Sequence, residues 1–498
     1  MKKKLISAIA LSLCLCMGAM VGCSSKKDSS SEPPKPLTKD EILAKIGEAY
    51  EATKAYKDGY TVIGTQKSEY KSFGEEEAEV YNTTIELTAN PNQKVVYYKQ
   101  AGVEGYEIQK LLKNGADYIM YQEYKEGDES EQDYTKYSEA YSTFYINEYY
   151  GFERIIDQYI QEESFAIASI DAYNAGYAKI IADSVAAVNA GSEDEESDFY
   201  GWTNPACSAL ISAEETADGS YVYTSKMSMQ MSNTVEKTTA VMTQETVITA
   251  KDGKLTSMKE VSETTRTKEI SDTETQTYSS KSEENFAITY TFDQAKYDGV
   301  SVTVPATVES RSYYSKEVTV MVNGIEFESA NTRMSGNTIQ AAVDSMTSNF
   351  KNEMNANENN ATITLYKDAA YTQAIDSATL SEADFYALDT IYVKAELKEG
   401  YALMNQSVAY GFAADVAAEY KTVYSAMLGY TNQMQLAIVS VANPYNVAEK
   451  AAQVGVQKVT VNGAAYTEDT VTFESGKTYE INYVMEMAQA DLNIFMMW

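Results

Sequence analysis

The stretch YVYTSKMSMQM, residues 221–231, alternates between two sets of side chains with a period of two. One set contains mostly polar or small residues. The other set contains the large side chains Tyr221, Tyr223, Met227, Met229 and Met231. Such alternation is typical of an antiparallel β-strand that buries only one of its faces. We therefore expect this stretch to lie in a sheet whose apolar face is covered by other elements.

A second stretch in the same part of the chain has the same period. In NFAITYTF, residues 285–292, the apolar positions are Phe286, Ile288, Tyr290 and Phe292. Earlier strand-like stretches lie at 59–70, 79–89 and 93–101, followed by a hairpin at 110–124. The hairpin turns at Asn114-Gly115, a strong signal because both residue types accept the positive φ of a tight turn. The sequence thus predicts an antiparallel sheet with strands on both sides of residues 138–190.

Helical patterns precede and separate these strands. Thr38 and Glu41 have the spacing of a capping box, which opens a helix. Apolar residues then recur at helical spacing up to Tyr50, and we expect the helix to stop near Asp58-Gly59. Residues 138–190 also show helical spacing. For residues 38–308 we therefore predict an α+β domain, in which a curved antiparallel sheet forms a half-barrel with covering helices.

The last third of the chain predicts β-rich modules. KEVTVMVNGIEF at 316–327 and QKVTVNGAAYTEDTVTF at 457–473 share a hairpin with a Val-Asn-Gly turn. Helical patterns follow at 339–354 and 413–427. The stretches ITLYKDAAYTQAI and DTIYVKAELKEGY resemble modules of bacterial surface proteins with small, sandwich-like β folds. We expect one or two mainly-β, sandwich-like modules, at 309–400 and 401–498.

Composition limits the partners. The 498 residues carry a formal net charge of −33, and 44% of them are hydrophobic, which is enough for real cores. A chain of this length suggests two to four domains. The strong negative charge disfavours binding to nucleic acid, so no nucleic-acid partner is expected.

The sequence offers little catalytic chemistry. It contains no histidine, which excludes Ser-His-Asp and Cys-His arrangements. One cysteine beyond the N-terminal segment, Cys207, cannot build a zinc site, and we expect it to be an inert, buried residue. Neither a phosphate-binding loop nor a dinucleotide fingerprint occurs. Carboxylate pairs for glycoside hydrolysis and calcium binding by the acidic run at 191–198 stay open. The prediction is a protein without catalytic residues, metal or cofactor.

The N-terminal segment has the features of an export signal. Lys2, Lys3 and Lys4 precede an apolar stretch that ends at Cys23. Met20-Val21-Gly22-Cys23 resembles the lipobox of bacterial lipoproteins. This resemblance implies cleavage before Cys23 and acylation of its thiol, with 1–22 as the signal peptide. Two or more acyl chains anchor a protein stably, whereas one holds it weakly. Residues 23–37, rich in Ser, Lys and Pro, are then a disordered tether on the outer side of the cell membrane.

The order of elements in 38–308, with the lipobox, resembles that of lipoprotein carriers of the LolA type and of the LppX and LprG lipoproteins. The resemblance implies an apolar cavity for a hydrophobic or lipid ligand beneath a curved sheet. The candidate ligand-binding residues are Tyr221, Tyr223, Met227, Met229, Met231, Phe286, Ile288 and Tyr290. The same residues also fit a filled core. Two further functions stay open, namely a surface interaction or adhesion protein without a cavity, and a glycan-binding lipoprotein of an uptake system.

Overall fold

The computed structural model describes residues 36–152, 165, 167–191, 193, 195, 200–271, 273–327, 332–414, 416–418, 420–421, 433–442, 458–466 and 473–488. The predicted signal peptide, Cys23 and nearly all of the predicted tether lie outside the described residues. So does most of the helix predicted at 413–427.

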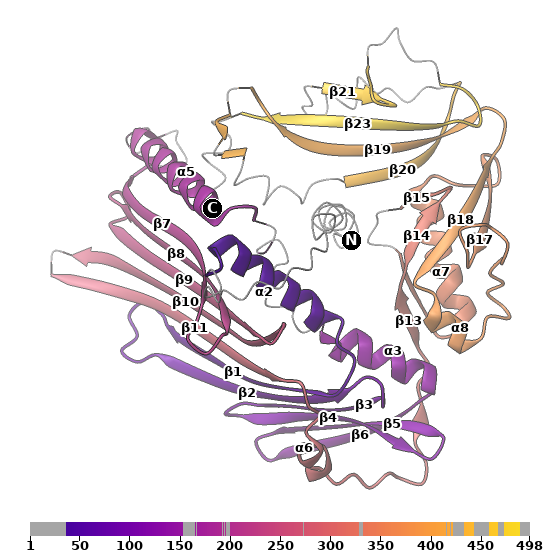
Figure 1. Ribbon diagram of the computed structural model, residues 1–498, viewed down its shortest axis with the longest axis horizontal. Helices are drawn as coiled ribbons and strands as arrows, with labels where there is room; N and C mark the ends of the chain where they lie inside the picture. Colours follow the sequence, from indigo (N-terminus) through magenta and orange to yellow (C-terminus); the bar gives the residue numbers. More distant parts are fainter. Residues whose placement is uncertain are drawn as a thin grey trace, which may run out of the picture.

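One large open sheet of twelve strands dominates the structure (Figure 1). Its order is β12-β6-β5-β4-β3-β2-β1-β11-β10-β9-β8-β7. The first six strands are β1 (Tyr60–Lys71), β2 (Glu79–Asn90), β3 (Val95–Ala101), β4 (Gly105–Asn114), β5 (Asp117–Glu126) and β6 (Glu129–Tyr137). The later strands are β7 (Trp202–Glu215), β8 (Tyr221–Asn233), β9 (Thr238–Lys251), β10 (Lys254–Ser271), β11 (Glu274–Thr289) and β12 (Glu309–Ser310). The predicted strands and the hairpin at 110–124 are confirmed, but its two turn residues are Gly115 and Ala116, because Asn114 ends β4 opposite Asp117.

Pairing in this sheet is antiparallel except at one edge. The short β12 lies parallel to β6, with Glu309 opposite Thr135. Each of β2–β6 pairs with the strand before it, and each of β8–β11 does the same within the second group. The two groups meet where β1 pairs with β11, from Thr61 opposite Thr289 to Lys71 opposite Ser279. This non-local pairing joins the two meanders into one sheet.

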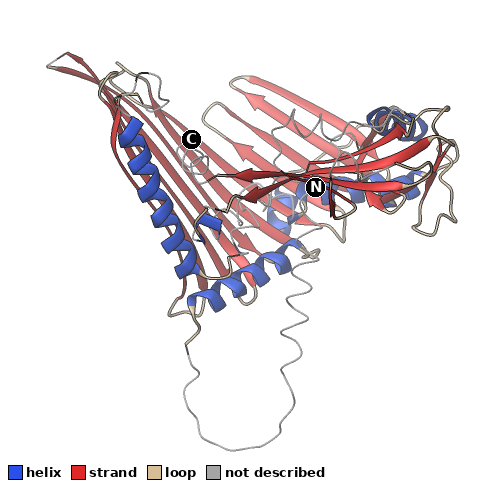
Figure 2. Cartoon of the chain, turned by 90° about the horizontal axis from the view of Figure 1, so that it is seen from above, coloured by secondary structure: helices blue, strands red, loops and turns tan. Residues whose placement is uncertain are grey.

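Of the helices in the described residues that pack on this sheet, three lie on one face and a short one lies on the other (Figures 1 and 2). The three are α2 (Lys39–Lys54), α3 (Glu139–Tyr150) and α5 (Ile170–Gly191), and the fourth is α6 (Gln294–Gly299). The predicted capping box of α2 is confirmed, because Thr38 and Glu41 each accept from the other's backbone N–H. Helix α2 ends at Lys54, four residues before the predicted stop.

Helix α2 supplies the centre of the main hydrophobic core. Its side chains Leu43, Ile46 and Tyr50 are almost fully buried against the sheet. The sheet contributes side chains from both groups of strands, including Val62, Leu87, Leu111, Met120, Ile248, Met258, Phe286 and Ile288. Burial of each such side chain stabilises the fold by roughly 1.5–3 kcal/mol relative to exposure. The covered face therefore holds α2 and the two meanders together.

A buried hydroxyl joins α2 to an irregularity in β10. The register of β10 against β9 shifts between Leu255 and Ser257, which is a β-bulge. The backbone N–H of Leu255 donates to Thr53 Oγ1 of α2 at 3.0 Å, and its carbonyl accepts from the Tyr290 hydroxyl at 2.6 Å. Both backbone groups of the bulge are thus satisfied by side chains. Tyr290 has a structural role at the rim of the core.

Helix α5 protects the free edge of the sheet. It runs along β7, the last strand in the order. The Asn174 side chain of α5 accepts from the Ile211 backbone N–H at 2.9 Å and donates to the Ile211 carbonyl at 2.8 Å. One amide side chain thereby reproduces the pairing that a further strand would provide. Covering an edge in this way blocks pairing with another chain.

We predict that Asn174→Ala lowers the free energy of unfolding by about 1–3 kcal/mol, because it leaves two backbone groups of Ile211 without their partner. Urea unfolding measures this change. Asp171→Ala is the control on the same helix, since its ion pair with Lys39 is exposed and worth at most about 1 kcal/mol. Equal loss in the two variants would contradict the edge-capping role.

The C-terminal region forms three smaller sheets. A two-stranded sheet joins β13 (Tyr314–Glu317) and β16 (Arg333–Gly336). The four-stranded sheet is β15 (Ile325–Glu326), β14 (Thr319–Val322), β18 (Thr390–Leu397) and β17 (Ala361–Tyr366). The five-stranded sheet is β20 (Gln433–Ser440), β19 (Tyr401–Phe412), β23 (Thr478–Met487), β21 (Lys458–Val461) and β22 (Ala464–Ala465). Helices α7 (Ile339–Glu353) and α8 (Glu382–Ala387) pack with the first two of these sheets.

The two Val-Asn-Gly turns have the same local geometry but lie in sheets of different topology. Asn323 and Asn462 have φ of 48° and 49°, and the following glycines are also left-handed. Asn323 Oδ1 accepts from the Ala395 N–H, and Asn462 Oδ1 accepts from the Glu480 N–H, both at 2.9 Å. However, β14 lies parallel to its neighbour β18, whereas β21 lies antiparallel to β23. The shared turn therefore does not indicate a shared module topology.

The predicted fold class is wrong. The chain is mostly β, and its N-terminal part is one broad open sheet rather than a distinct α+β half-barrel domain. Sandwich-like modules do not follow it, because α7 and α8 cover the four-stranded sheet. The physical reason is that alternation shows that one face of a strand is buried and does not show what buries it. The boundaries at 308 and 400 stay predictions, although β12 extends the large sheet to Ser310.

The C-terminal region contacts the helices of the large sheet at two places. At one, the Arg311 guanidinium lies 3.5 Å from the Tyr141 ring centroid of α3 and forms an ion pair with Glu382 of α8. At the other, Tyr420 packs beside Ile180 of α5, and its hydroxyl donates to Asp183 at 2.9 Å. Helix α5 is therefore held by β7 on one side and by the C-terminal region on the other.

Candidate functional site

Cross-strand register sorts the helix-facing side chains of β8–β11 into rows. One row is apolar and consists of Tyr223, Ile248, Met258 and Phe286, each opposite the next. Two residues further along the strands lies a polar row of Ser225, Thr246, Glu260 and Glu284, continued by Gln66 of β1. Both rows face the helices, because each alternates with the opposite face of its strand. This face is thus apolar beside α2 and polar beyond it.

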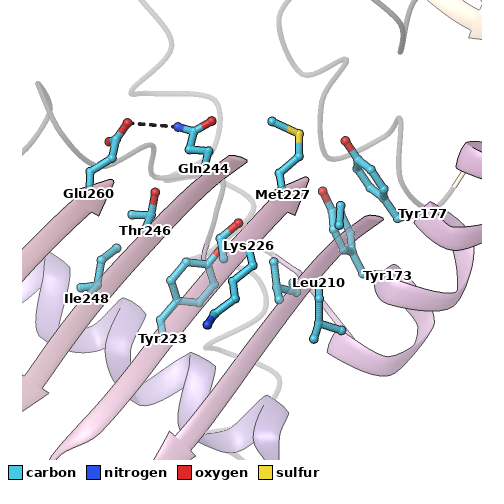
Figure 3. A pocket seen from close by; sticks show the side chains of 13 residues that line it. Tyr173, Tyr177, Leu210, Tyr223, Lys226, Met227, Gln244, Thr246, Ile248 and Glu260 are labelled. Carbon is cyan, nitrogen blue, oxygen red and sulfur yellow. Dashed lines mark hydrogen bonds between the residues drawn. The ribbon is translucent and has the colours of Figure 1, made fainter. Parts of the chain in front are cut away.

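A pocket of about 310 Å³ lies where the two rows pass α5 (Figure 3). Tyr173 and Tyr177 of α5 form one wall, and their ring centroids are 5.8 Å apart. Tyr223 and Ile248 lie at the apolar end, and Glu260 with Gln244 lies at the polar end. The volume falls at the lower end of the range for ligand pockets, roughly 300–1,000 Å³.

Two smaller hollows extend this pocket. One shares Thr246, Ile248 and Glu260 with it and reaches Glu284 and Phe286. The other shares Tyr177, Ala209 and Met227 with it and reaches Cys207 and Met229. We call the three together the α5 groove. Residues of α5 line the pocket and the hollow at Cys207, whereas the hollow at Glu284 is lined by β9–β11 alone.

The structure separates the sequence-predicted ligand residues into two groups. Tyr223, Met227, Met229 and Phe286 line the α5 groove. The remaining candidates do not line it, and these are Tyr221, Met231, Ile288 and Tyr290. Ile288 is buried in the main core, and Tyr221 and Tyr290 pack against that core. Met227 is the most accessible of the eight, with 47% of its surface exposed.

Two carboxylates of the groove lie side by side, and neither forms an ion pair with a described lysine or arginine. Glu260 and Glu284 are direct cross-strand neighbours on β10 and β11. Glu260 accepts from Gln244 Nε2 at 3.0 Å, and Glu284 accepts from Gln66 Nε2 at 3.5 Å. Burial, and then the charge of Glu260, raise the pKa of Glu284 above its ordinary value. The groove therefore concentrates negative charge at its polar end.

The lysines that border the groove are occupied on the opposite face. Lys226 forms an ion pair with Glu245 at 2.7 Å, and Lys259 forms one with Glu283 at 3.4 Å. Each alternates along its strand with a groove residue, so its ammonium group points away from the helices. Neither lysine neutralises the pair of carboxylates within the groove.

The cysteine that lines the groove is not activated. Cys207 is half-buried and free, and burial raises the pKa of its thiol. The thiolate is the nucleophilic form, so a raised pKa disfavours nucleophilic chemistry at neutral pH. Within the described residues, no group of three or more Cys, Asp or Glu side chains is placed to hold a metal ion. Over the same residues, no helix has both the length and the apolar composition that crossing a bilayer requires.

Sequence reasoning missed the polar half of the groove. Met258 and Glu260 share a strand face in the sequence pattern, but only the register of β10 places Glu260 beside Glu284. Tyr173 and Tyr177 are recognisable as members of a helix, yet nothing in the sequence shows which strand that helix follows. The groove therefore could not be predicted from the sequence, because it forms only when segments far apart in the chain pair in the folded structure.

Comparisons with known proteins add little to this geometry. No protein-family model matches the chain, and no curated protein matches it. Among solved structures, the chain is similar to a DUF1329 family protein from Desulfovibrio piger ATCC 29098. The two share 8% sequence identity, and the match covers 52% of this chain and 98% of that chain with a TM-score of 0.16. A likeness at this level assigns neither a fold nor a function.

We predict that Glu284→Gln stabilises the protein at pH 7 and has no effect near pH 4. A raised pKa in the folded state means that the ionised carboxylate opposes folding. This penalty is present above the folded pKa and vanishes below the ordinary glutamate pKa of about 4.3. Thermal unfolding at the two pH values measures it. Glu283→Gln is the matched control, because hydrogen bonds and the Lys259 ion pair lower the pKa of Glu283, so no gain is expected.

Proposed function

We propose that this protein is an extracytoplasmic lipoprotein, anchored in the cell membrane through acylated Cys23, that binds a hydrophobic or lipid ligand and catalyses no reaction. The lipobox-like residues Met20–Cys23 and the polar segment after them support the anchor. The α5 groove is the proposed binding site.

The observation that carries the binding proposal is the unfilled part of the helix-facing surface. Beside α2 the described side chains form the main hydrophobic core, but beside α5 a volume of about 310 Å³ is left between the sheet and the helix. Tyr173, Tyr223 and Ile248 offer apolar surface there. Met227 and Met229 are unbranched and adaptable, which suits an apolar ligand of variable shape. A surface interaction protein would not need this hollow.

The anchor predicts that Cys23 takes up fatty acid. In a bacterial host fed a labelled fatty acid, the full chain is expected to incorporate label, and Cys23→Ser is expected to lose it. Cys207→Ser is the control, because its thiol is free in the folded chain and lies beyond the proposed anchor. Label that persists in Cys23→Ser, or that disappears in Cys207→Ser, would refute the assignment. Fractionation should then find Cys23→Ser detached from the membrane.

The groove predicts that the protein binds a neutral apolar probe. The protein for this test begins at residue 24 and so keeps every described residue. We expect N-phenyl-1-naphthylamine to bind with enhanced fluorescence. Met227→Asp should weaken binding by about tenfold or more, since it places a charge against an apolar ligand. Ile63→Asp is the control, because Ile63 is 39% exposed and alternates with the helix-facing Val62 and Gly64. Binding that both variants weaken equally, or that the parent chain lacks, would overturn the groove as a site.

A further inference from the structure

The α5 groove has charge of one sign at one end and aromatic surface at the other. Glu260 and Glu284 lie side by side at the polar end and have glutamine side chains as hydrogen-bond donors. The bordering lysines are paired on the opposite face of the sheet. A ligand that fills this groove therefore brings its own cation, or it leaves the carboxylates next to an apolar body.

The aromatic wall favours the same class of ligand. Tyr173, Tyr177 and Tyr223 all line the pocket that holds Glu260. Tyr173 and Tyr177 lie at the opposite end of the pocket from Glu260, so they offer apolar surface to the body of the ligand while the carboxylates lie beside its head. An anionic head would meet repulsion from both glutamates.

The size of the groove limits the apolar part. A volume of about 310 Å³ suits one small ligand, and it does not suit a molecule with two long acyl chains. The apolar row of Ile248, Met258 and Phe286 leads from the pocket toward the main core, where α2 fills the remaining space. The ligand body is therefore one alkyl chain or a small ring system.

We infer that the α5 groove binds a cationic amphiphile, with a single alkyl or aryl body and an amine or quaternary ammonium head beside Glu260 and Glu284. This inference rests on the proposed function and narrows it, because it excludes anionic lipid as the ligand of this groove. Binding is non-covalent and requires no other component.

Three probes that share a decyl group test the inference. The protein for this test again begins at residue 24. The probes are decyltrimethylammonium, decyl glucoside and decyl sulfate, each titrated by calorimetry below its critical micelle concentration. We expect the cation to bind at least tenfold more tightly than the glucoside, and the sulfate to bind more weakly than the glucoside. The double variant Glu260→Gln and Glu284→Gln should reduce the affinity for the cation by about tenfold and change the affinity for the glucoside by less than twofold.

Two single variants separate a local effect from general attraction to an acidic protein. Glu284→Gln and Glu283→Gln remove the same charge from neighbouring residues of β11, but only Glu284 lines the groove. The inference requires that Glu284→Gln weakens binding of the cation and that Glu283→Gln does not. Folding is monitored by the same thermal unfolding that reports the stability of Glu284→Gln.

The outcomes distinguish this inference from the proposal beneath it. If the cation and the glucoside bind with equal affinity, and the variants change neither affinity, the inference is overturned while the ligand-binding function stands. If Glu283→Gln lowers the affinity for the cation as much as Glu284→Gln does, the cation is attracted by the net charge of the protein and not by the groove. The inference then also fails. If no probe binds, both the inference and the proposed ligand-binding function fall.

Discussion

The pairing of β1 with β11 is the contact on which the rest of the structure depends. It joins residues that lie more than two hundred positions apart in the sequence and turns two meanders into one sheet. Closing so long a segment carries an entropic penalty, which burial of the shared face must offset. Helix α2 supplies that burial on β7–β10 and helix α3 supplies it on β3 and β5, and side chains from both groups of strands join in one core. The same pairing brings Gln66 beside Glu284 and so completes the polar row.

The lengths of the elements explain why the helix-facing surface changes character. Helix α2 has 16 residues, about 24 Å at 1.5 Å per residue, and it crosses the strands near one end. Strand β10 has 18 residues, about 60 Å when extended. A helix that crosses the strands covers only a narrow band of their length. Beyond that band, polar residues such as Glu260 and Gln244 occupy the helix-facing positions.

Side chains at the margin of the core show how one strand face serves two purposes. Tyr290 satisfies the carbonyl of the bulge at Leu255, so its hydroxyl is used in holding the sheet to α2. On β8, Tyr223 is buried while Met227 is open to the groove, although they are only four positions apart and both face the helices. The alternation identified this face correctly. Positions on this face that lie close to α2 belong to the core, and positions further from α2 line the groove.

The sequence by itself determined the predicted strands, the capped start of α2, the hairpin of β4 and β5, the turn at Asn323-Gly324 and the apolar set on β8, because each depends on neighbouring residues. Only the tertiary structure decided that the first sheet is open and twelve strands wide and that α7 and α8 cover the four-stranded sheet. It also decided that Glu260 meets Glu284 and that Asn174 caps Ile211. The physical reason is that periodicity records which side of an element is buried, whereas register and layer packing depend on contacts between segments far apart in the chain.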